Sequence, residues 1–290
     1  MIKIKEKRYP YCKFTITQER QIIDKYIQGK SLREIGKEYD CDPTTVRNIL
    51  KAYKVETRNY SQARRNFLSY SINENSFAYD NKNTAYWLGV MYSDGYISKT
   101  GKYTNYFGLT INEKDLEWLE QFKLFLQYNG KIIRFTSNTT FKKGTKVARL
   151  LIGNNKIVSD LEKWGVVEKK TFKLKELPST SFLDDFIRGY IDGDGSLNKK
   201  YPNIIICGTK DFLLSIANYF KIPYSIYSDK SIFALHYNTK ESTYLEKRLY
   251  KNAEYALQRK FLIAKRSFDS PITLEDVMKN SEYQGKPLEP

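Results

Sequence analysis

The sequence predicts an α+β protein in which an all-α unit precedes two copies of a mixed repeat. Residues 14 to 58 show the spacing of short helices with polar residues between them. From residue 83 onward, helical stretches alternate with β-rich runs such as YFGLTI and NIIIC. A mostly apolar segment that ends in Asp-Gly at residues 94–95 is echoed one hundred residues later at 194–195. The repeat and the change of periodicity together define the fold class.

The N-terminal unit reads as three helices. Thr17 is expected to cap the first, which ends at Gly29. Ser31 caps the second, with Glu34 at capping-box spacing, and Pro43 opens the third. Three helices with a tight turn before the last form the helix-turn-helix plan, which we place in residues 1–60.

The outward side chains of the third helix suit base edges and phosphates in a major groove. With the basic residue that follows the helix, the predicted DNA contacts are Thr44, Thr45, Arg47, Asn48, Lys51 and Arg58. A solvated polar face on an ordinary three-helix bundle is the alternative. The stretch GKSLREIGKEYDCDPTTVRNILKAYKVETR also resembles the helix-turn-helix of resolvase and invertase recombinases.

The composition points to a polyanionic partner. Lys and Arg number 49 against 33 Asp and Glu, a net charge of +16, and nucleic acid is the commonest polyanion. One histidine and three isolated cysteines argue against zinc sites, histidine-based nucleases and a disulfide framework. No stretch approaches the ~20 apolar residues of a membrane span. We therefore expect an intracellular protein, whether cytoplasmic, organellar or phage-encoded.

Two polar segments frame the repeats. Residues 61–82 lack sustained periodicity and are expected to form a linker, in which Arg64 and Arg65 follow a phosphate backbone. Residues 269–290 are expected to form a loose polar tail. The repeats themselves are assigned to residues 83–175 and 176–268.

Small residues and terminal acids give the repeated helices their chemical interest. Gly89 and Ser93 are four apart, as are Gly189 and Gly193, so each helix has a flat face on which the two can approach closely. Parallel packing would bring the aspartates at 94 and 194 together at the helix C-termini. Two carboxylates there repel each other and face the negative ends of two helix dipoles. A hard divalent cation would reverse this cost, so we predict a metal site.

These paired motifs resemble those of LAGLIDADG homing endonucleases in their single-chain, two-repeat form. The matching residues are Gly89, Asp94 and Gly95 in the first copy, and Gly189, Ile191, Asp192, Asp194 and Gly195 in the second. Tyr92 stands where the family has its first aspartate, a position that is not the family's metal ligand. The family's metal-binding acid, which precedes the final glycine, is present in both copies.

The resemblance implies a pseudo-two-fold αββαββα fold whose two sheets form a saddle over the DNA major groove. It implies that Asp94 and Asp194 bind Mg²⁺ or another divalent cation such as Mn²⁺, not zinc, aided by carbonyls near Ser93 and Gly193. Lys170 and Lys260 match catalytic lysines. Basic DNA-contacting side chains on the strands and their tips are expected at Arg134, Lys142, Lys143, Lys146, Arg149 and Lys230.

The resulting hypothesis is a monomeric, metal-dependent endonuclease that cuts double-stranded DNA at a specific site, one phosphodiester per strand. Two alternatives stay open. An RNA-splicing maturase on the same fold would stimulate intron splicing. A DNA-binding regulator that has lost nuclease activity would bind without cutting.

Overall fold

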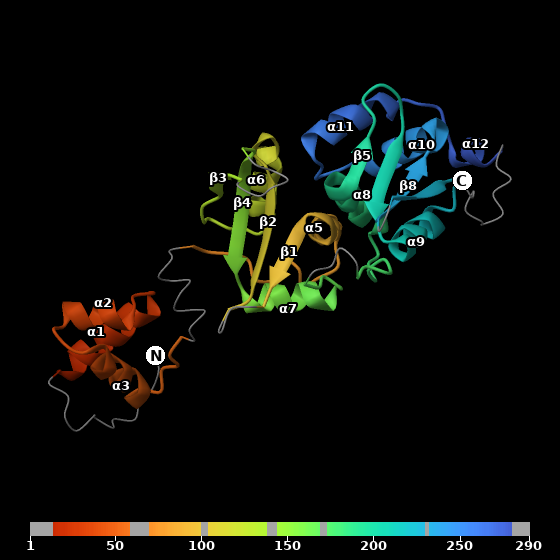
Figure 1. The fold of residues 1–290 in the computed structure, drawn as a ribbon. Helices are drawn as coiled ribbons and strands as arrows, with labels where there is room; N and C mark the ends of the chain where they lie inside the picture. The colour runs from red at the N-terminus through yellow and green to blue at the C-terminus, as the bar shows by residue number, and fades with distance from the viewer. Residues whose placement is uncertain are drawn as a thin grey trace. The chain divides into compact units, whose positions relative to one another are not determined.

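The computed structural model of the 290-residue chain describes residues 14–58, 70–99, 104–137, 144–168, 173–229 and 232–279. The chain divides into two compact units, Met1–Ser71 and Ile72–Pro290, which are described separately. Figure 1 shows the elements in chain order, from red at the N-terminus to blue at the C-terminus.

The first unit is built from three short helices, as the sequence predicts. They are α1 (Ile16–Ile27), α2 (Leu32–Glu38) and α3 (Pro43–Ala52). One small apolar core joins them, with Ile22, Ile35, Val46, Ile49 and Leu50 at its centre. Each of these side chains is almost fully buried. The unit therefore owes its stability to one amphipathic face per helix.

Polar caps fix where these helices begin. Thr15, rather than the predicted Thr17, caps α1: Gln18 donates its backbone N–H to Thr15 Oγ1 at 3.3 Å and accepts from the Thr15 N–H at 2.9 Å. The reciprocal box needs Gln three residues after the cap, and Thr17 has no such partner. Ser31 and Glu34 form the predicted box on α2. Asp42 accepts from the Thr44 N–H at 2.7 Å and caps α3.

The second unit contains two halves with the same order of elements, αββαββα. The first half comprises α5 (Lys82–Ser93), β1 (Gly95–Ser98), β2 (Tyr106–Asn112), α6 (Leu116–Phe125), β3 (Ile133–Thr136), β4 (Lys146–Gly153) and α7 (Asn155–Lys163). The second comprises α8 (Leu183–Asp194), β5 (Gly195–Leu197), β6 (Ile204–Gly208), α9 (Lys210–Phe220), β7 (Ser225–Asp229), β8 (Ile232–Tyr237) and α10 (Thr239–Tyr250). The predicted repeat topology is confirmed.

Each half forms one four-stranded antiparallel sheet. The strand orders are β1-β2-β4-β3 and β5-β6-β8-β7, so the two sheets have the same connectivity. In β2 the side chains of Phe107, Leu109 and Ile111 enter the core, while the alternate residues lie on the opposite face. Helices cover the first face, and one continuous hydrophobic core spans both halves.

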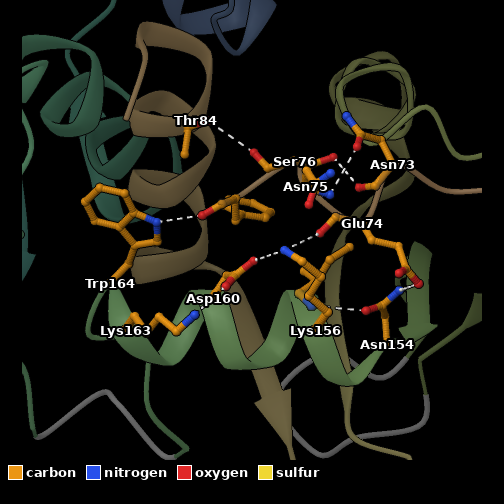
Figure 2. Close-up of polar contacts among 12 residues, drawn as sticks. Asn73, Glu74, Asn75, Ser76, Thr84, Asn154, Lys156, Asp160, Lys163 and Trp164 are labelled. Atoms are coloured by element: carbon orange, nitrogen blue, oxygen red, sulfur yellow. Dashed lines mark hydrogen bonds and ion pairs between the residues drawn. The ribbon is translucent and has the colours of Figure 1, made fainter. Parts of the chain in front are cut away.

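Residues 72–82 are part of the second unit, although the sequence assigned them to a linker. Phe77 is fully buried in the core. Its carbonyl accepts from Trp164 Nε1 at 2.7 Å, and Glu74 accepts from Asn154 Nδ2 at 3.0 Å (Figure 2). On α7, the Asp160 carboxylate is paired with two lysines, one turn before it and one turn after it (Figure 2). The segment thus fastens α5 to α7.

The region expected as a loose tail contains ordered structure where it is described. After α11 (Gln258–Ala264) comes a short helix α12 (Leu274–Met278), capped by Thr273. Val277 is only 2% exposed and joins the main core. The polar composition of the segment conceals this apolar contact.

Candidate active site

The centre of the second unit is a close crossing of α5 and α8, which share the most extensive contact between any two described elements. Gly89 and Gly189 make this approach possible. A Cβ atom at Gly89 would lie 2.0 Å from the carbonyl oxygen of Phe186, and one at Gly189 would lie 2.0 Å from that of Tyr86. Since no side chain tolerates such distances, backbone packs on backbone at both points.

The same packing continues to the C-terminal ends of the two helices. A Cβ atom at Gly193 would lie 2.0 Å from Ser93 Oγ and 3.3 Å from Asp94 Oδ2. The Asp94 carboxylate therefore reaches the residue that precedes Asp194. Asp94 is the C-cap residue of α5, Asp194 is the last residue of α8, and both are exposed. The structure brings together the four residues that the sequence selected here.

Two exposed carboxylates at two helix C-termini make this end of the crossing strongly negative. The local donors are carboxylate and carbonyl oxygens, which suit a hard divalent cation such as Mg²⁺ better than zinc. The described residues contain no cluster of three or more His, Cys, Asp or Glu side chains that would form a closed metal cage. Two carboxylates supply fewer than the roughly six oxygen ligands that Mg²⁺ takes, so a cation held by Asp94 and Asp194 would keep positions for water.

Lys260 lies directly behind this acidic end. Its Nζ donates to the carbonyl oxygens of Ile191 at 2.6 Å, Asp192 at 2.7 Å and Gly195 at 2.7 Å. The side chain is only 2% exposed, and burial lowers the pKa of its ammonium group to about 8 while nearby carboxylates oppose the shift. All three ammonium protons are used on the C-terminal turn of α8. Lys260 thus holds the backbone that carries Asp194.

Asp192 joins four elements from inside the core. Its Oδ2 accepts from the Tyr86 hydroxyl and the Leu257 N–H, and its Oδ1 from the Tyr250 hydroxyl, each at 2.8 Å. Trp118 Nε1 in turn donates to the Tyr86 hydroxyl at 2.7 Å. Burial raises the pKa of Asp192, and the donors and Lys260 oppose that shift. The sequence marked Asp192 only as a motif identity and gave no sign of these partners.

At the position equivalent to Asp192, the first half has Tyr92. Tyr92 donates its hydroxyl to the Trp164 carbonyl at 2.5 Å, and burial raises the pKa of that hydroxyl to about 12. Gly165, with φ +92°, makes room: a Cβ there would lie 2.3 Å from the Tyr92 oxygen. The tyrosine at this position therefore makes one internal hydrogen bond, where Asp192 in the second half accepts three. The two halves share a fold and differ in their internal polar contacts.

The predicted DNA contacts of the first unit divide into three groups. Thr44, Arg47 and Lys51 are exposed on α3. Arg58 is instead held internally: its guanidinium stacks on the Tyr26 ring at 4.0 Å and donates to carbonyls of Tyr26, Gly29 and Lys30. Arg58 therefore stabilises the end of α1, contrary to the expectation from sequence. Thr45 and Asn48 are half-buried on α3.

The basic residues predicted to contact DNA from the strands of the first sheet lie on both of its faces. Arg149 pairs with Thr110 on the face turned away from the helices. Arg134 pairs with the buried Ala148, and Lys146 with Thr136, so these two basic residues lie on the other face, at its exposed edge. The remaining basic candidates lie outside the described residues: Arg64, Arg65, Lys142, Lys143, Lys170 and Lys230.

In comparisons with known proteins, no family model matches the chain. No curated protein matches its sequence either. The solved structures to which it is similar include the LAGLIDADG meganuclease I-AabMI bound to uncleaved DNA, at 13% identity and TM-score 0.45, covering 69% of this chain and 96% of that one. Another is the homing endonuclease I-WcaI bound to its DNA recognition sequence, at 11% identity and TM-score 0.49, covering 72% and 96%. A third is the N-terminal LAGLIDADG domain of DUF199/WhiA, at 13% identity and TM-score 0.35, covering 71% and 87%.

Within the described residues, no helix has the length and apolarity needed to cross a membrane.

Proposed function

We propose that this chain is a metal-dependent endonuclease that cleaves double-stranded DNA at a specific site. The observation that carries the proposal is the approach of Asp94 to the residue preceding Asp194, at the ends of two helices packed backbone to backbone. The repeated motif resembles that of LAGLIDADG enzymes at Asp94 and Asp194 and at the glycine that follows each. A net charge of +16 fits a polyanionic substrate.

The reaction would be hydrolysis of one phosphodiester in each strand. Water forms a new P–O bond, one P–O ester bond breaks, and the products are a phosphate monoester and a hydroxyl group. A divalent cation held by Asp94 and Asp194 would activate water and neutralise the charge of the phosphate. The residues of the chain fix the two carboxylates through the α5–α8 crossing. Lys260 acts as a positioning residue, because its protons are directed to backbone carbonyls.

Recognition would be shared between the two units. In the first, Thr44, Thr45, Arg47, Asn48 and Lys51 of α3 would contact a major groove beside the cleavage site. In the second, the faces of the two sheets turned away from the helices would contact the DNA around the cut. Since one chain supplies both acidic helix ends, a monomer would cut both strands of an asymmetric site.

Incubation of the protein with a randomised DNA library in Mg²⁺, followed by sequencing of the products, tests the proposal. We expect cuts at one sequence class in both strands. Asp94→Asn and Asp194→Asn should each abolish double-strand cleavage and leave binding largely intact, while Asp269→Asn, an exposed acid elsewhere, should change nothing. Full cleavage by both motif variants would refute the assignment of the two acids. Sequence-specific binding without any cutting would instead favour a regulator.

A further inference from the structure

Each sheet of the second unit has a helix-covered face and an open face. In β2 and β4 the partners Leu109 and Leu150 lie on the covered face and are nearly inaccessible. The alternate pair, Thr110 and Arg149, lies on the open face. In the second sheet, Ile205 and its partner His236 identify the open face in the same way.

The open face of the second sheet is neutral apart from the end of its edge strand β7, where Asp229 occupies the position paired with Ile232. Its described side chains are Ser196, Ile205, Cys207, Ser225, Tyr227, Ile232, Ala234 and His236. The strands β5, β6 and β8 contain no Lys, Arg, Asp or Glu. Tyr227 and Ile232 are 45% and 42% exposed, and the Tyr227 ring packs edge-on against His236 at 4.9 Å. This face offers methyl groups, ring edges and hydroxyls.

The open face of the first sheet differs by one cation. Besides Tyr, Ser, Thr and aliphatic residues, its described strands place Asn112, Phe135 and Arg149 there. The Arg149 guanidinium lies 4.7 Å from the centre of the Phe135 ring, and its Nε donates to Thr110 Oγ1 at 3.2 Å. Its two terminal nitrogens make no hydrogen bond to the part of the chain that the structure describes. The guanidinium is thus oriented by its neighbours and keeps the four N–H donors of its two terminal nitrogens for a ligand.

Duplex DNA is the occupant that fits these faces, and this step rests on the proposed function. Exposed Lys199 and Lys200 lie in the turn between β5 and β6, at the edge of the neutral face. Cations at the rim match phosphates, whereas side chains at the centre meet base edges. The rim is therefore complementary in charge to the DNA backbone, and the centre determines which bases are accepted.

The bases differ in what they show in the major groove. Thymine presents a methyl group, guanine is read best by Arg or Lys, and cytosine is read by an acceptor such as Asp or Glu. A face with aliphatic and aromatic groups but few charges matches thymine methyl groups. We propose that the second half of this protein selects a thymine-rich half-site through methyl contacts made by Ile205, Tyr227 and Ala234. Arg149 reads one guanine in the opposite half-site.

Replacement of thymine by deoxyuridine tests this directly, since it removes the methyl group and keeps base pairing. The probe is the cleavage site selected from the library, with deoxyuridine in place of thymidine in one half-site at a time. An iron chelate attached to a cysteine introduced in the turn between β5 and β6 (Lys200→Cys), in a chain with Cys12→Ser, Cys41→Ser and Cys207→Ser, assigns the half-site that faces the second sheet. We expect affinity to fall about fourfold for each contacted methyl group lost there. Deoxyuridine in the other half-site should change the affinity little.

Two variants connect the effect to the named residues. Ile205→Ser should lose most of the preference for thymine over uracil, whereas Leu262→Ser, at an exposed leucine on α11, should retain it. Arg149→Gln should lower discrimination at one G·C pair about tenfold. A selected site whose second half-site is rich in G·C pairs, or equal affinity for thymine and uracil DNA, would overturn this inference and leave the endonuclease proposal intact. Failure to bind or cut any DNA would refute the proposed function itself.

Discussion

The ammonium nitrogen of Lys260 lies 2.6 Å from the carbonyl oxygen of Ile191, one turn before the end of the helix that carries Asp194. Two further carbonyls complete its contacts. Helix C-termini leave carbonyls without intrahelical partners, and here a buried lysine donates to that of Asp192. The Ile191 carbonyl accepts from both the Gly195 N–H and Lys260. The positive charge also offsets the negative helix end and the carboxylates beside it. The position of Asp194 therefore depends on a residue of α11.

Lys260→Met should lower the free energy of unfolding by about 3 kcal/mol, because it removes three hydrogen bonds that a buried ammonium group donates to carbonyls. Cleavage should fall together with Mg²⁺ affinity, since the backbone beneath Asp194 is released, while DNA affinity changes little. Chemical denaturation and cation titration by calorimetry measure the two effects. Lys265→Met, an exposed lysine just after α11, serves as the control. Unchanged Mg²⁺ affinity in Lys260→Met would contradict the positioning role.

The acidic pair should cost stability when no cation is bound. Asp94→Asn is therefore expected to raise the free energy of unfolding in EDTA by about 0.5–1 kcal/mol, because it removes both a like-charge repulsion and an unfavourable helix-end charge. The same variant should lose the rise in melting temperature that Mg²⁺ gives the unaltered protein. Thermal melts with and without Mg²⁺ measure both. Equal stabilisation by Mg²⁺ in the two proteins would place the cation elsewhere.

The backbone-to-backbone packing of α5 on α8 at Gly89 predicts that two glycine-to-alanine substitutions will differ greatly in their effect on the free energy of unfolding. Gly89→Ala should cost about 3 kcal/mol, because its new methyl group meets the Phe186 backbone, which cannot move without separating the helices. Gly208→Ala should cost under about 1 kcal/mol, because the first atom it meets is the hydroxyl of the Tyr190 side chain, at 2.9 Å. Denaturant unfolding of the two variants provides the comparison. Similar losses would mean that the crossing tolerates separation.

The internal polar contacts of the two halves should also differ in strength. Tyr92→Phe removes one hydrogen bond to a carbonyl, so about 1 kcal/mol is expected. Asp192→Ala removes the acceptor of two buried hydroxyls and one amide, so about 3 kcal/mol or more is expected. Equilibrium unfolding measures both. If Tyr92→Phe proved the more damaging, the asymmetry described between the halves would be wrong.

Local patterns in the sequence were sufficient to predict most of the helices and strands, but not the ordered segment 72–82 or the helix α12. The four-residue spacing of Gly89 and Ser93 predicts a helix face, and the repeat predicts its partner. Partners far apart in the chain were not predictable: the three carbonyls that bind Lys260 lie 65 to 69 residues away. The Arg58 contacts, 28 to 32 residues away, were missed for the same reason. A charged side chain alone does not reveal whether it faces solvent or a carbonyl.

Arg47 and Arg58 should therefore respond differently to the same change. Arg47→Ala removes an exposed cation from α3 and should weaken DNA binding, with a shallower dependence of affinity on salt, while the first unit stays as stable as before. Arg58→Ala removes the stacking on Tyr26 and the bonds to carbonyls at the end of α1, so the unit should lose about 2 kcal/mol of stability. Binding titrations at several salt concentrations, with circular-dichroism melts of the full chain, separate the two roles. An Arg58→Ala protein that melts normally but binds DNA more weakly would indicate that Arg58 contacts DNA, because only a solvent-facing cation produces that combination.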